Sequence, residues 1–540
     1  MSTWQEKARA KQLAAASKIP SAWRLPDTTL SALAPDSNVL DIPRTSGLLS
    51  SRELTITETD DASLLLEKLA AREYSALEVT TAFSKRAAIA QQVVCCLTET
   101  FFEEAAERAK FLDEHLARTG KPLGPLHGLP ISLKDSFNVA GQHSTLGFVS
   151  FLEHPPQSRN SAVVDILLAA GAVLYVKTNI PQTMMTADSH NHVFGRVLNP
   201  HRRNLTAGGS TGGEGALVAM RGSILGVGTD VAGSIRIPAL CCGLVGFKPS
   251  VGRVPYGGQT MAARPGAAAV GIAPVAGPLC HSVRDAEMLL RVITNSHPED
   301  LDDVALPIPW RELDVSERSR PLTIGLLHED QAYPLHPSMH RALTQAAAKL
   351  AEAGHKVVDL SEKAPSLEAI ARLTFQYFGM DPDKTLFSHI LRGEEPFIPS
   401  LAVLGTGTTV EMRDPTLRNL FDMNVARSDL AEAMRKAYVD NKVDVILTPG
   451  FQSCAVPHDT YDNGLYTTMP NLLDYPACIL PFGEANEEAD AAFVRDIDYK
   501  PPYKPKEIEG APCHVQIVGR RLQDEKLAQH VAEIQRVLNA

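Results

Sequence analysis

The chain has 540 residues, and 52 Lys and Arg stand against 63 Asp and Glu, so its formal net charge is −11. This length allows about three or four domains of roughly 150 residues each, or one large α/β core with insertions. The acidic balance argues against nucleic acid or an anionic membrane as the main partner, because both attract clustered Lys and Arg. A membrane span needs about 20 predominantly apolar residues in succession, and the sequence contains no such run.

The cysteines and the N-terminus indicate a cellular location. The eight cysteines include the adjacent pairs Cys95–Cys96 and Cys241–Cys242, and no Cys-x-x-Cys motif occurs. This pattern does not indicate a disulfide framework, and a reducing compartment fits it best. Residues 1–26 lack the apolar segment of a secretory signal. We therefore expect a cytoplasmic protein.

The chain begins with a segment whose composition differs from the rest. Residues 1–60 are rich in Pro, Ser and Thr after a first helix-like stretch, and we expect them to form an arm packed on the main body. Residues 61–540 are expected to form a single domain. It opens with helical patterns at Ala62–Tyr74, Ala76–Gln91 and Phe102–Arg118, the second preceded by Ser75 and Glu78 at capping-box spacing.

Strand and helix patterns alternate after residue 120. Strands are expected at Ile131–Asp135, Ala172–Lys177, Ile224–Thr229, Leu322–Leu327, His355–Leu360, Val443–Thr448, Ala477–Pro481 and Cys513–Arg520, with helices such as Ser161–Ala170, Pro337–Ala353 and Leu522–Leu538 between them. This alternation predicts an α/β fold with a large mixed, mostly parallel sheet covered by helices on both faces. Residues 361–440 lack strand patterns and are expected to form a helical insertion that could shape a substrate pocket.

The segment 208–250 is unusually rich in glycine, which indicates close backbone approaches or tight turns. A phosphate-binding loop requires Gly-x-x-x-x-Gly-Lys-Ser/Thr, and that string is absent. A dinucleotide fingerprint requires a third glycine, but Gly226-Val227-Gly228 is followed by Thr229-Asp230-Val231. Both nucleotide-binding interpretations therefore fail.

A serine nucleophile is the third interpretation of this segment. Residues 208–212 match Gly-x-Ser-x-Gly around Ser210, but the polar residues before them do not form the apolar strand that an α/β-hydrolase elbow follows. Ser234 is a second candidate. It ends the run Val231–Ser234, in which small residues leave successive N–H groups unobstructed, as in a loop that holds an oxyanion.

A serine nucleophile needs a base, and Lys134 is a candidate. On a strand at 131–135, Ile131 and Leu133 share one face while Ser132 and Lys134 share the other. Desolvation there would favour the neutral amine. Lowering the pKa of a lysine from near 10.4 to about 7 costs roughly 4–5 kcal/mol. The spacing alone cannot assign such a role.

Several motifs together resemble the amidase signature family. They are the block at 208–249 and the segment Gly-Leu-Pro-Ile-Ser-Leu-Lys-Asp at 128–135. Further segments, at 39–50, 125–130, 176–183 and 510–512, are similar to those of fungal acetamidases and general amidases. The resemblance implies the amidase-signature fold and hydrolysis of a small-molecule carboxylic amide to a carboxylate and ammonia or an amine. It also implies a Ser–cis-Ser–Lys triad, an acyl-enzyme, and no metal or organic cofactor.

The resemblance assigns roles to individual residues. Lys134 matches the base, Ser210 the bridging serine held by a cis peptide bond, and Ser234 the nucleophile. The remaining assignments are Val231, Ala232, Gly233 and Ser234 as the oxyanion loop, Met184 as a substrate contact, and Thr229, Asp230 and Arg236 as supports of the loop, the last two as an ion pair.

Two positions depart from the common pattern of the family. Thr211 stands where many members have a second serine, and its hydroxyl should be tolerated. Ala232 stands where many have glycine, and its Cβ disfavours positive φ, so the geometry of the loop could differ.

Two other functions stay open from the sequence. One is a subunit of the transfer-RNA amidotransferase type that acts with a partner; the long arm before Leu64 and the acidic charge favour a stand-alone hydrolase instead. The other is a serine esterase with Ser210 as nucleophile and His281 as base. Fungal relatives suggest short aliphatic or aryl-acetic primary amides as substrates. If the chain oligomerises, a homodimer is the commonest expectation.

Overall fold

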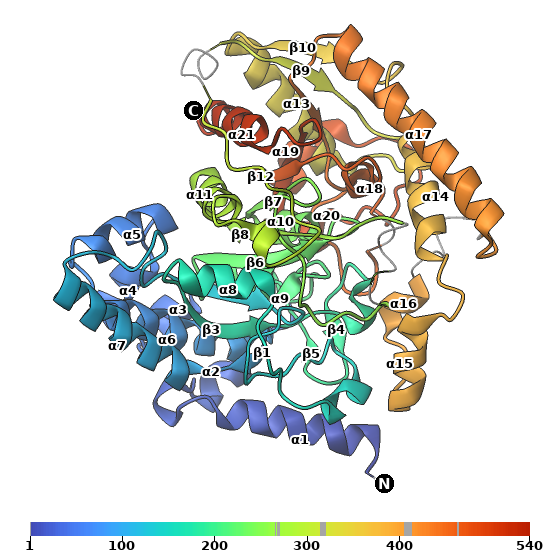
Figure 1. Ribbon diagram of the computed structural model, residues 1–540. Helices are drawn as coiled ribbons and strands as arrows, with labels where there is room; N and C mark the ends of the chain where they lie inside the picture. The colour runs from blue at the N-terminus through green and yellow to red at the C-terminus, as the bar shows by residue number, and fades with distance from the viewer. Residues whose placement is uncertain (1, 265, 267–270, 314–319, 404–412, 462–463) are drawn as a thin grey trace.

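A large sheet runs through the centre of the computed structural model, which describes residues 2–264, 266, 271–313, 320–403, 413–461 and 464–540 (Figure 1). It has 11 strands in the order β1-β3-β2-β6-β8-β7-β12-β13-β11-β9-β10. Their bounds are β1 Leu97–Thr100, β2 Pro130–Lys134, β3 Val173–Thr178, β6 Leu225–Asp230, β7 Val245–Lys248, β8 Val275–Cys280, β9 Thr323–Leu326, β10 Lys356–Asp359, β11 Val445–Thr448, β12 Ala477–Glu484 and β13 Pro512–Val518. A separate pair is formed by β4 His190–Asn191 and β5 Gly195–Arg196.

The sheet mixes parallel and antiparallel pairs. The parallel pairs lie in two parts, β3–β2–β6 and β11–β9–β10, where helices connect successive strands. Antiparallel pairs join β6, β8, β7, β12, β13 and β11 between those parts. The expected α/β class with a large mixed sheet is confirmed. Parallel pairs are a smaller share of it than expected, because β8 lies antiparallel between β6 and β7, and β13 lies antiparallel between β12 and β11.

All eight expected strands are present, with ends that agree within about three residues. Three strands of the large sheet were not expected, β1, β7 and β8, and neither was the separate pair β4 and β5. The strand β8 contains Gly277 and Pro278, and β7 is four residues long with Gly246 at its second position. Glycine and proline weaken the residue pattern that identifies a strand in a sequence. The strands β7 and β8 are therefore evident only in the structure, where neighbouring strands pair with them.

Helices cover both faces of the sheet. Every residue of β1, β2, β3, β6, β7, β8, β11 and β13 is buried, and successive strand residues point to opposite faces. The covering helices are α5 Ala62–Ala70, α6 Ala76–Val94, α7 Phe102–Thr119, α8 Ala162–Ala169, α9 Gly212–Ala219, α10 Arg236–Cys242, α11 Val283–Thr294, α13 Pro337–Glu352, α18 Leu465–Leu472 and α21 Asp524–Leu538. The capping box expected at Ser75 and Glu78 is present at the start of α6.

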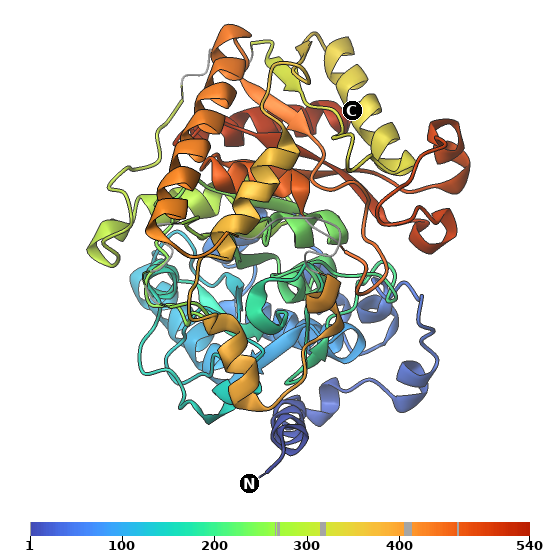
Figure 2. The ribbon, with the colours of Figure 1, turned by 90° about the vertical axis from the view of Figure 1, so that its right-hand side faces the viewer.

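Most of the remaining helices lie in the two segments that the sequence sets apart, residues 1–60 and residues 361–440. Residues 2–60 contain α1 Trp4–Ser17, α2 Asp27–Ser31, α3 Ile42–Thr45 and α4 Ser51–Thr57. The described part of 361–440 contains α14 Leu367–Phe378, α15 Thr385–Gly393, α16 Pro399–Val403 and α17 Leu417–Asp440, which lie together on one side of the molecule (Figure 2). Two short helices, α19 Glu487–Asp490 and α20 Pro505–Ile508, lie near the C-terminus. Among the described residues, no helix has both the length and the apolar character needed to cross a membrane.

The helix α1 is joined to the strand β1 by buried charges. Glu99 on β1 is 2% exposed and forms ion pairs with Lys11 and, at 3.1 Å, with Lys18, both on or next to α1. Lys7 of the same helix forms a pair with Glu153 that is largely exposed, at 2.7 Å. The carboxylate of Glu99 is buried and that of Glu153 is exposed, so the pairs of Glu99 should contribute more to stability than the pair of Glu153.

We expect Glu99→Gln to lower the free energy of unfolding by about 1–2 kcal/mol, because it removes the only carboxylate that faces these two lysines among the described contacts. Urea unfolding and limited proteolysis at α1 would measure the change. The matched control is Glu153→Gln, which breaks an exposed pair of the same helix and should cost less than about 0.5 kcal/mol. Equal effects of the two changes would contradict the prediction.

Candidate active site

Three neighbouring parallel strands bring polar side chains to one edge of the sheet. Lys134 ends β2, Thr178 ends β3, and Asp230 ends β6. Lys134 is paired in register with Thr178, and Leu133 with Val227. Because the carboxyl ends of parallel strands meet at the same edge, these residues gather at one place in the fold.

Lys134 is fully buried at this edge. Its Nζ lies 2.7 Å from Ser210 Oγ and 2.7 Å from Thr229 Oγ1. Burial lowers the pKa of Lys134 from 10.5 to about 7, although the carboxylates of Asp230 and Glu214 oppose this shift. The amine therefore loses its proton near neutral pH, and it lies against the hydroxyl of Ser210.

Ser210 is placed by the backbone that precedes α9. The peptide bond Gly209–Ser210 is cis, as the resemblance implied. A Cβ at Gly209 would lie 2.2 Å from the carbonyl oxygen of Thr186, so only glycine fits this close approach. The departure at Thr211 is accommodated, because its Oγ1 donates a hydrogen bond to the carbonyl oxygen of Thr229 at 3.3 Å.

The loop that carries Ser234 is folded around the carboxylate of Asp230. This carboxylate accepts hydrogen bonds from the backbone N–H groups of Gly233 at 2.8 Å and Ile235 at 3.1 Å. Gly233 has φ +127°, and a Cβ there would lie 2.4 Å from Thr467 Oγ1. The glycine is thus required both by its backbone angle and by the space beside it.

Arg236 forms the expected ion pair with Asp230, in the deep interior. Its Nη2 lies 3.0 Å from Asp230 Oδ1, and both side chains are fully buried. The guanidinium also donates to Gln516 Oε1 at 2.7 Å and to Asn471 Oδ1 at 2.6 Å. Burial alone would raise the pKa of Asp230, but the charge and hydrogen bonds of Arg236 lower it to about 2.

The amides of this loop differ in what they contact. The N–H of Gly233 is occupied by Asp230, whereas the N–H groups of Val231, Ala232 and Ser234 donate to no other described residue. Ala232 is not among the residues with positive φ, so the Cβ at this departure from the family pattern causes no backbone strain. Its carbonyl oxygen accepts a hydrogen bond from Thr467 Oγ1 at 2.6 Å.

Ser210 and Ser234 both lie on the wall of a cavity of about 530 Å³. Ser234 Oγ donates no hydrogen bond to another described residue, and its side chain is 8% exposed. Met184 also lines the cavity, from a turn in which Thr183 and Met184 have φ of 74° and 58°. Of the residues expected at the site, Met184, Ser210, Thr229, Val231 and Ser234 therefore line this cavity, while Lys134 lies behind Ser210 and the others belong to the loop that carries Ser234.

Sequence analysis missed Glu214, a buried carboxyl group in the first turn of α9. It accepts hydrogen bonds from Ser132 Oγ on β2 at 2.5 Å and from Thr178 Oγ1 on β3 at 3.0 Å. Burial raises its pKa to about 8. Glu214 thus ties the helix after Ser210 to the two strands beside it. Asn471 and Gln516, which hold Arg236, were missed too, because residues so distant in sequence give no local pattern.

His281, the base of the esterase alternative, forms its hydrogen bond with a residue other than Ser210. His281 Nε2 lies 2.8 Å from the carbonyl oxygen of Val218, and burial lowers its pKa to about 4. Ser210 is instead within hydrogen-bond distance of Lys134. The geometry therefore supports a lysine-based site and gives the esterase arrangement no base.

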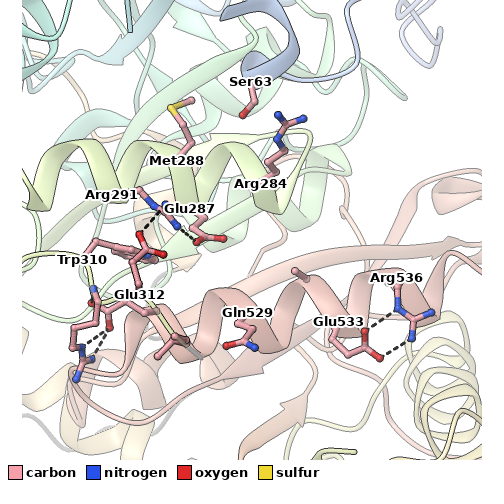
Figure 3. Close-up of a pocket in the computed structure, with 14 residues that line it drawn as sticks. Ser63, Arg284, Glu287, Met288, Arg291, Trp310, Glu312, Gln529, Glu533 and Arg536 are labelled. Carbon is pink, nitrogen blue, oxygen red and sulfur yellow. Dashed lines mark hydrogen bonds and ion pairs between the residues drawn. The ribbon is translucent and has the colours of Figure 1, made fainter. Parts of the chain in front are cut away.

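A second cavity, of about 590 Å³, lies between α11 and α21 and has a different character (Figure 3). Its arginines are paired with carboxylates: Arg284 with Asp61 and Glu67, Arg291 with Glu287 and Glu312, Arg311 with Glu525, and Arg536 with Glu533. Charges that neutralise one another in pairs leave no site for an ionic ligand, and neither Lys134 nor Ser234 lines this cavity.

Comparisons with known proteins identify the family to which the chain belongs. The family model described as Amidase matches residues 78–528. An amidase from Gibberella moniliformis is 39% identical over 529 residues, which cover 97% of this chain and 96% of the relative. An acetamidase from Emericella nidulans is 35% identical over 555 residues, 99% of this chain and 98% of the relative. The solved structure of a fatty acid amide hydrolase is 29% identical, with a TM-score of 0.90, and the match covers 99% of this chain and 95% of that one.

The fold, with these relatives, defines a hydrolase that acts on amide C–N bonds of small molecules. The chain belongs to the Amidase family. The expected membership of the amidase signature family, with fungal acetamidases and amidases among its relatives, is confirmed.

We expect Asp230→Asn to lower the free energy of unfolding by about 3–5 kcal/mol, because it leaves the buried guanidinium of Arg236 without a counter-charge. Since the folded pKa of Asp230 is about 2, below its usual 3.8, the stabilisation by its carboxylate is fully present above about pH 4 and is lost as the pH falls toward 2. Urea unfolding at pH 7 measures the first effect.

The control for this change is Glu432→Gln, which breaks the exposed pair of Glu432 with Arg435 on α17 and should cost less than about 1 kcal/mol. If Asp230→Asn were as mild as the control, the loop of Ser234 would not depend on this buried carboxylate.

Proposed function

We propose that the protein hydrolyses carboxylic amides through an acyl-enzyme on Ser234, with Lys134 as the base and Ser210 as the bridge between them. The observation that carries this proposal is the buried amine of Lys134, with a pKa of about 7, at 2.7 Å from Ser210 Oγ. Ser210 and Ser234 share the cavity wall, so a substrate bound there would contact both hydroxyl groups.

In the first half-reaction, neutral Lys134 accepts the proton of Ser210, and Ser210 accepts the proton of Ser234 as Ser234 Oγ attacks the amide carbon. The proton then passes back to the leaving nitrogen, which departs as ammonia or an amine. In the second half-reaction, water attacks the ester on Ser234 along the same route and releases the carboxylate. Thr229, at 2.7 Å from Lys134 Nζ, orients the amine.

The tetrahedral intermediate carries a negative charge that the loop 231–234 would stabilise. The free N–H groups of Val231, Ala232 and Ser234 are the donors in this proposal, and Gly233 acts by holding Asp230. Each donor of this kind is typically worth about 3 kcal/mol in the transition state. The ion pair of Asp230 with Arg236 keeps the loop in place.

A subunit that acts only with a partner is the alternative to a stand-alone enzyme. The stand-alone hydrolase is favoured because the curated relatives named amidase and acetamidase are covered over 96% and 98% of their length. Release of ammonia from simple amides by the purified single chain tests this choice. The location in the cytoplasm, the independence from nucleic acid and the homodimer stay predictions from the sequence.

We expect Ser234→Ala to lower kcat for ammonia release by at least about 10⁴-fold, because it removes the nucleophile. Stopped assays with an ammonia-coupled readout would measure it. Ser296→Ala, at an exposed position just after the end of α11, is the control and should leave kcat unchanged. Hydroxylamine added with an amide should trap the acyl group as a hydroxamate in the native enzyme. Full activity of Ser234→Ala, or no hydroxamate from an active enzyme, would contradict the mechanism.

We expect kcat/KM to rise with pH through an apparent pKa near 7, because only the neutral form of Lys134 can accept a proton. Asp230 and Glu214 are the carboxyl groups that face this amine, and the pKa of about 7 already includes the upward effect of their charges. A pH–rate profile between pH 5.5 and 9, with circular dichroism as a check on folding, would measure it. A profile that falls across this range would exclude a neutral lysine as the base.

A further inference from the structure

Another cavity, of about 680 Å³, is lined by α17 and by the segments that follow α18 and β13. Of its lining residues, Gly271 also lines the cavity beside Ser234, whereas Lys134, Ser210 and Ser234 are not part of its wall. It is therefore a separate cavity, and the mechanism proposed above does not use it.

Four arginines line this cavity, and two of them are paired with carboxylates. Arg435 on α17 forms two hydrogen bonds with the carboxylate of Glu432, each 2.7 Å long. Arg521 Nε donates to Asp474 Oδ2 at 2.6 Å. Glu432 and Asp474 are the carboxylates in the described part of the wall. Both are thus occupied by a neighbouring arginine.

The other two arginines, Arg427 and Arg520, form no ion pair with a carboxylate of the described residues. Arg427 Nη1 donates to the carbonyl oxygen of Gly271 at 3.0 Å, and its Cζ lies 6.0 Å from the centre of the Tyr377 ring. The side chain of Arg520 forms no hydrogen bond within the described part of the chain. Both arginines are half-buried. Partial burial weakens the screening by water, so these two charges favour an anion in the cavity.

Tyr475 adds a neutral donor to the same wall. The residue is 8% exposed, and its hydroxyl group forms no hydrogen bond with any residue that the structure describes. Burial raises the pKa of Tyr475, and the charges of Arg520 and Arg435 oppose this shift, so both guanidinium groups lie near the phenol. Guanidinium and phenol groups together are the donors that an oxyanion requires.

The charge and size of the cavity indicate the class of ligand. In the cavity between α11 and α21 each arginine has a carboxylate partner, whereas here two positive charges remain without one. Two unpaired positive charges match a ligand with two negative charges. The volume of about 680 Å³ lies within the range of about 300–1,000 Å³ that is usual for small-molecule sites.

We propose that this cavity binds a small dianion, a phosphate monoester or a dicarboxylate, through Arg427, Arg520 and the hydroxyl group of Tyr475. Arginine binds the oxygens of both groups through its fixed set of N–H donors. Asn471 lines the same cavity, and its side chain forms hydrogen bonds with Asp230 at 2.9 Å and Arg236 at 2.6 Å. The anion would thus lie beside a support of the Ser234 loop and outside the catalytic cavity.

Isothermal titration calorimetry of the full chain with phenyl phosphate, succinate and phenol tests the proposal, at about pH 8 and low ionic strength. We expect at least one of the two dianions to bind with a Kd below about 1 mM, and neutral phenol to bind at least tenfold more weakly. The tighter of the two dianions identifies the preferred group. Absence of binding by both dianions, or equal binding of phenol, would overturn the proposal.

Variants locate the bound anion. Arg427→Gln and Arg520→Gln should each raise the Kd at least tenfold, because each removes one unpaired charge of the wall. Arg536→Gln removes the same charge at a position on α21 that is 67% exposed, and it should change the Kd less than twofold. Glu432→Gln frees Arg435 and should lower the Kd at least threefold. If Arg520→Gln, folded by circular dichroism, bound the dianion as tightly as the native chain, the anion would not occupy this cavity.

Ammonia-release assays separate this site from the cavity beside Ser234. Phenyl phosphate at a saturating concentration should leave KM for an amide substrate unchanged within twofold. A competitive rise in KM would place the anion beside Ser234 and would overturn the assignment. Calorimetry requires no turnover, so a chain that hydrolysed no amide would contradict the amidase mechanism and would still report whether the dianion binds.

Discussion

The site depends on the removal of one lysine from water. The pKa of Lys134 falls from 10.5 to about 7 through burial, which corresponds to about 5 kcal/mol of preference for the neutral form. The charges of Asp230 and Glu214 raise this pKa, but burial outweighs both of them. Arg236 is paired with Asp230, and burial raises the pKa of Glu214 to about 8, which reduces the negative charge near the amine.

The same ion pair serves the geometry of the loop. Replacing a buried ion pair by apolar residues often leaves the stability of a protein unchanged, so a gain in stability does not by itself explain the presence of this pair. Here both oxygens of Asp230 accept backbone N–H groups of the loop that carries Ser234, and Arg236 fills the remaining space around them. The pair therefore holds the turn of the backbone, and the N–H groups of Val231, Ala232 and Ser234 are left without a partner among the described residues.

Much of this arrangement could be predicted from the sequence, and the exceptions have physical causes. The period of two placed Ser132 and Lys134 on one face of a strand, and both side chains do contact residues that flank the start of α9. The contact partner of Ser132, Glu214, lies 82 residues further along the chain, and no local pattern connects the two. The strand β8 was missed because Gly277 and Pro278 interrupt the residue pattern of a strand. In the structure it pairs with an antiparallel strand on each side.

The two parts of the site come from different kinds of structure. The amine, the bridging hydroxyl and the Ser234 loop are held at the carboxyl ends of buried strands, where every neighbour is fixed by packing on both faces of the sheet. The far wall of the cavity is made by α14 and α17, whose outer faces are in solvent. A change of side chain on those helices alters the shape of the cavity without moving Lys134. In the mechanism proposed here the catalytic groups are therefore held by the sheet, whereas the far wall of the cavity is formed by helices that a sequence pattern identifies only as an insertion.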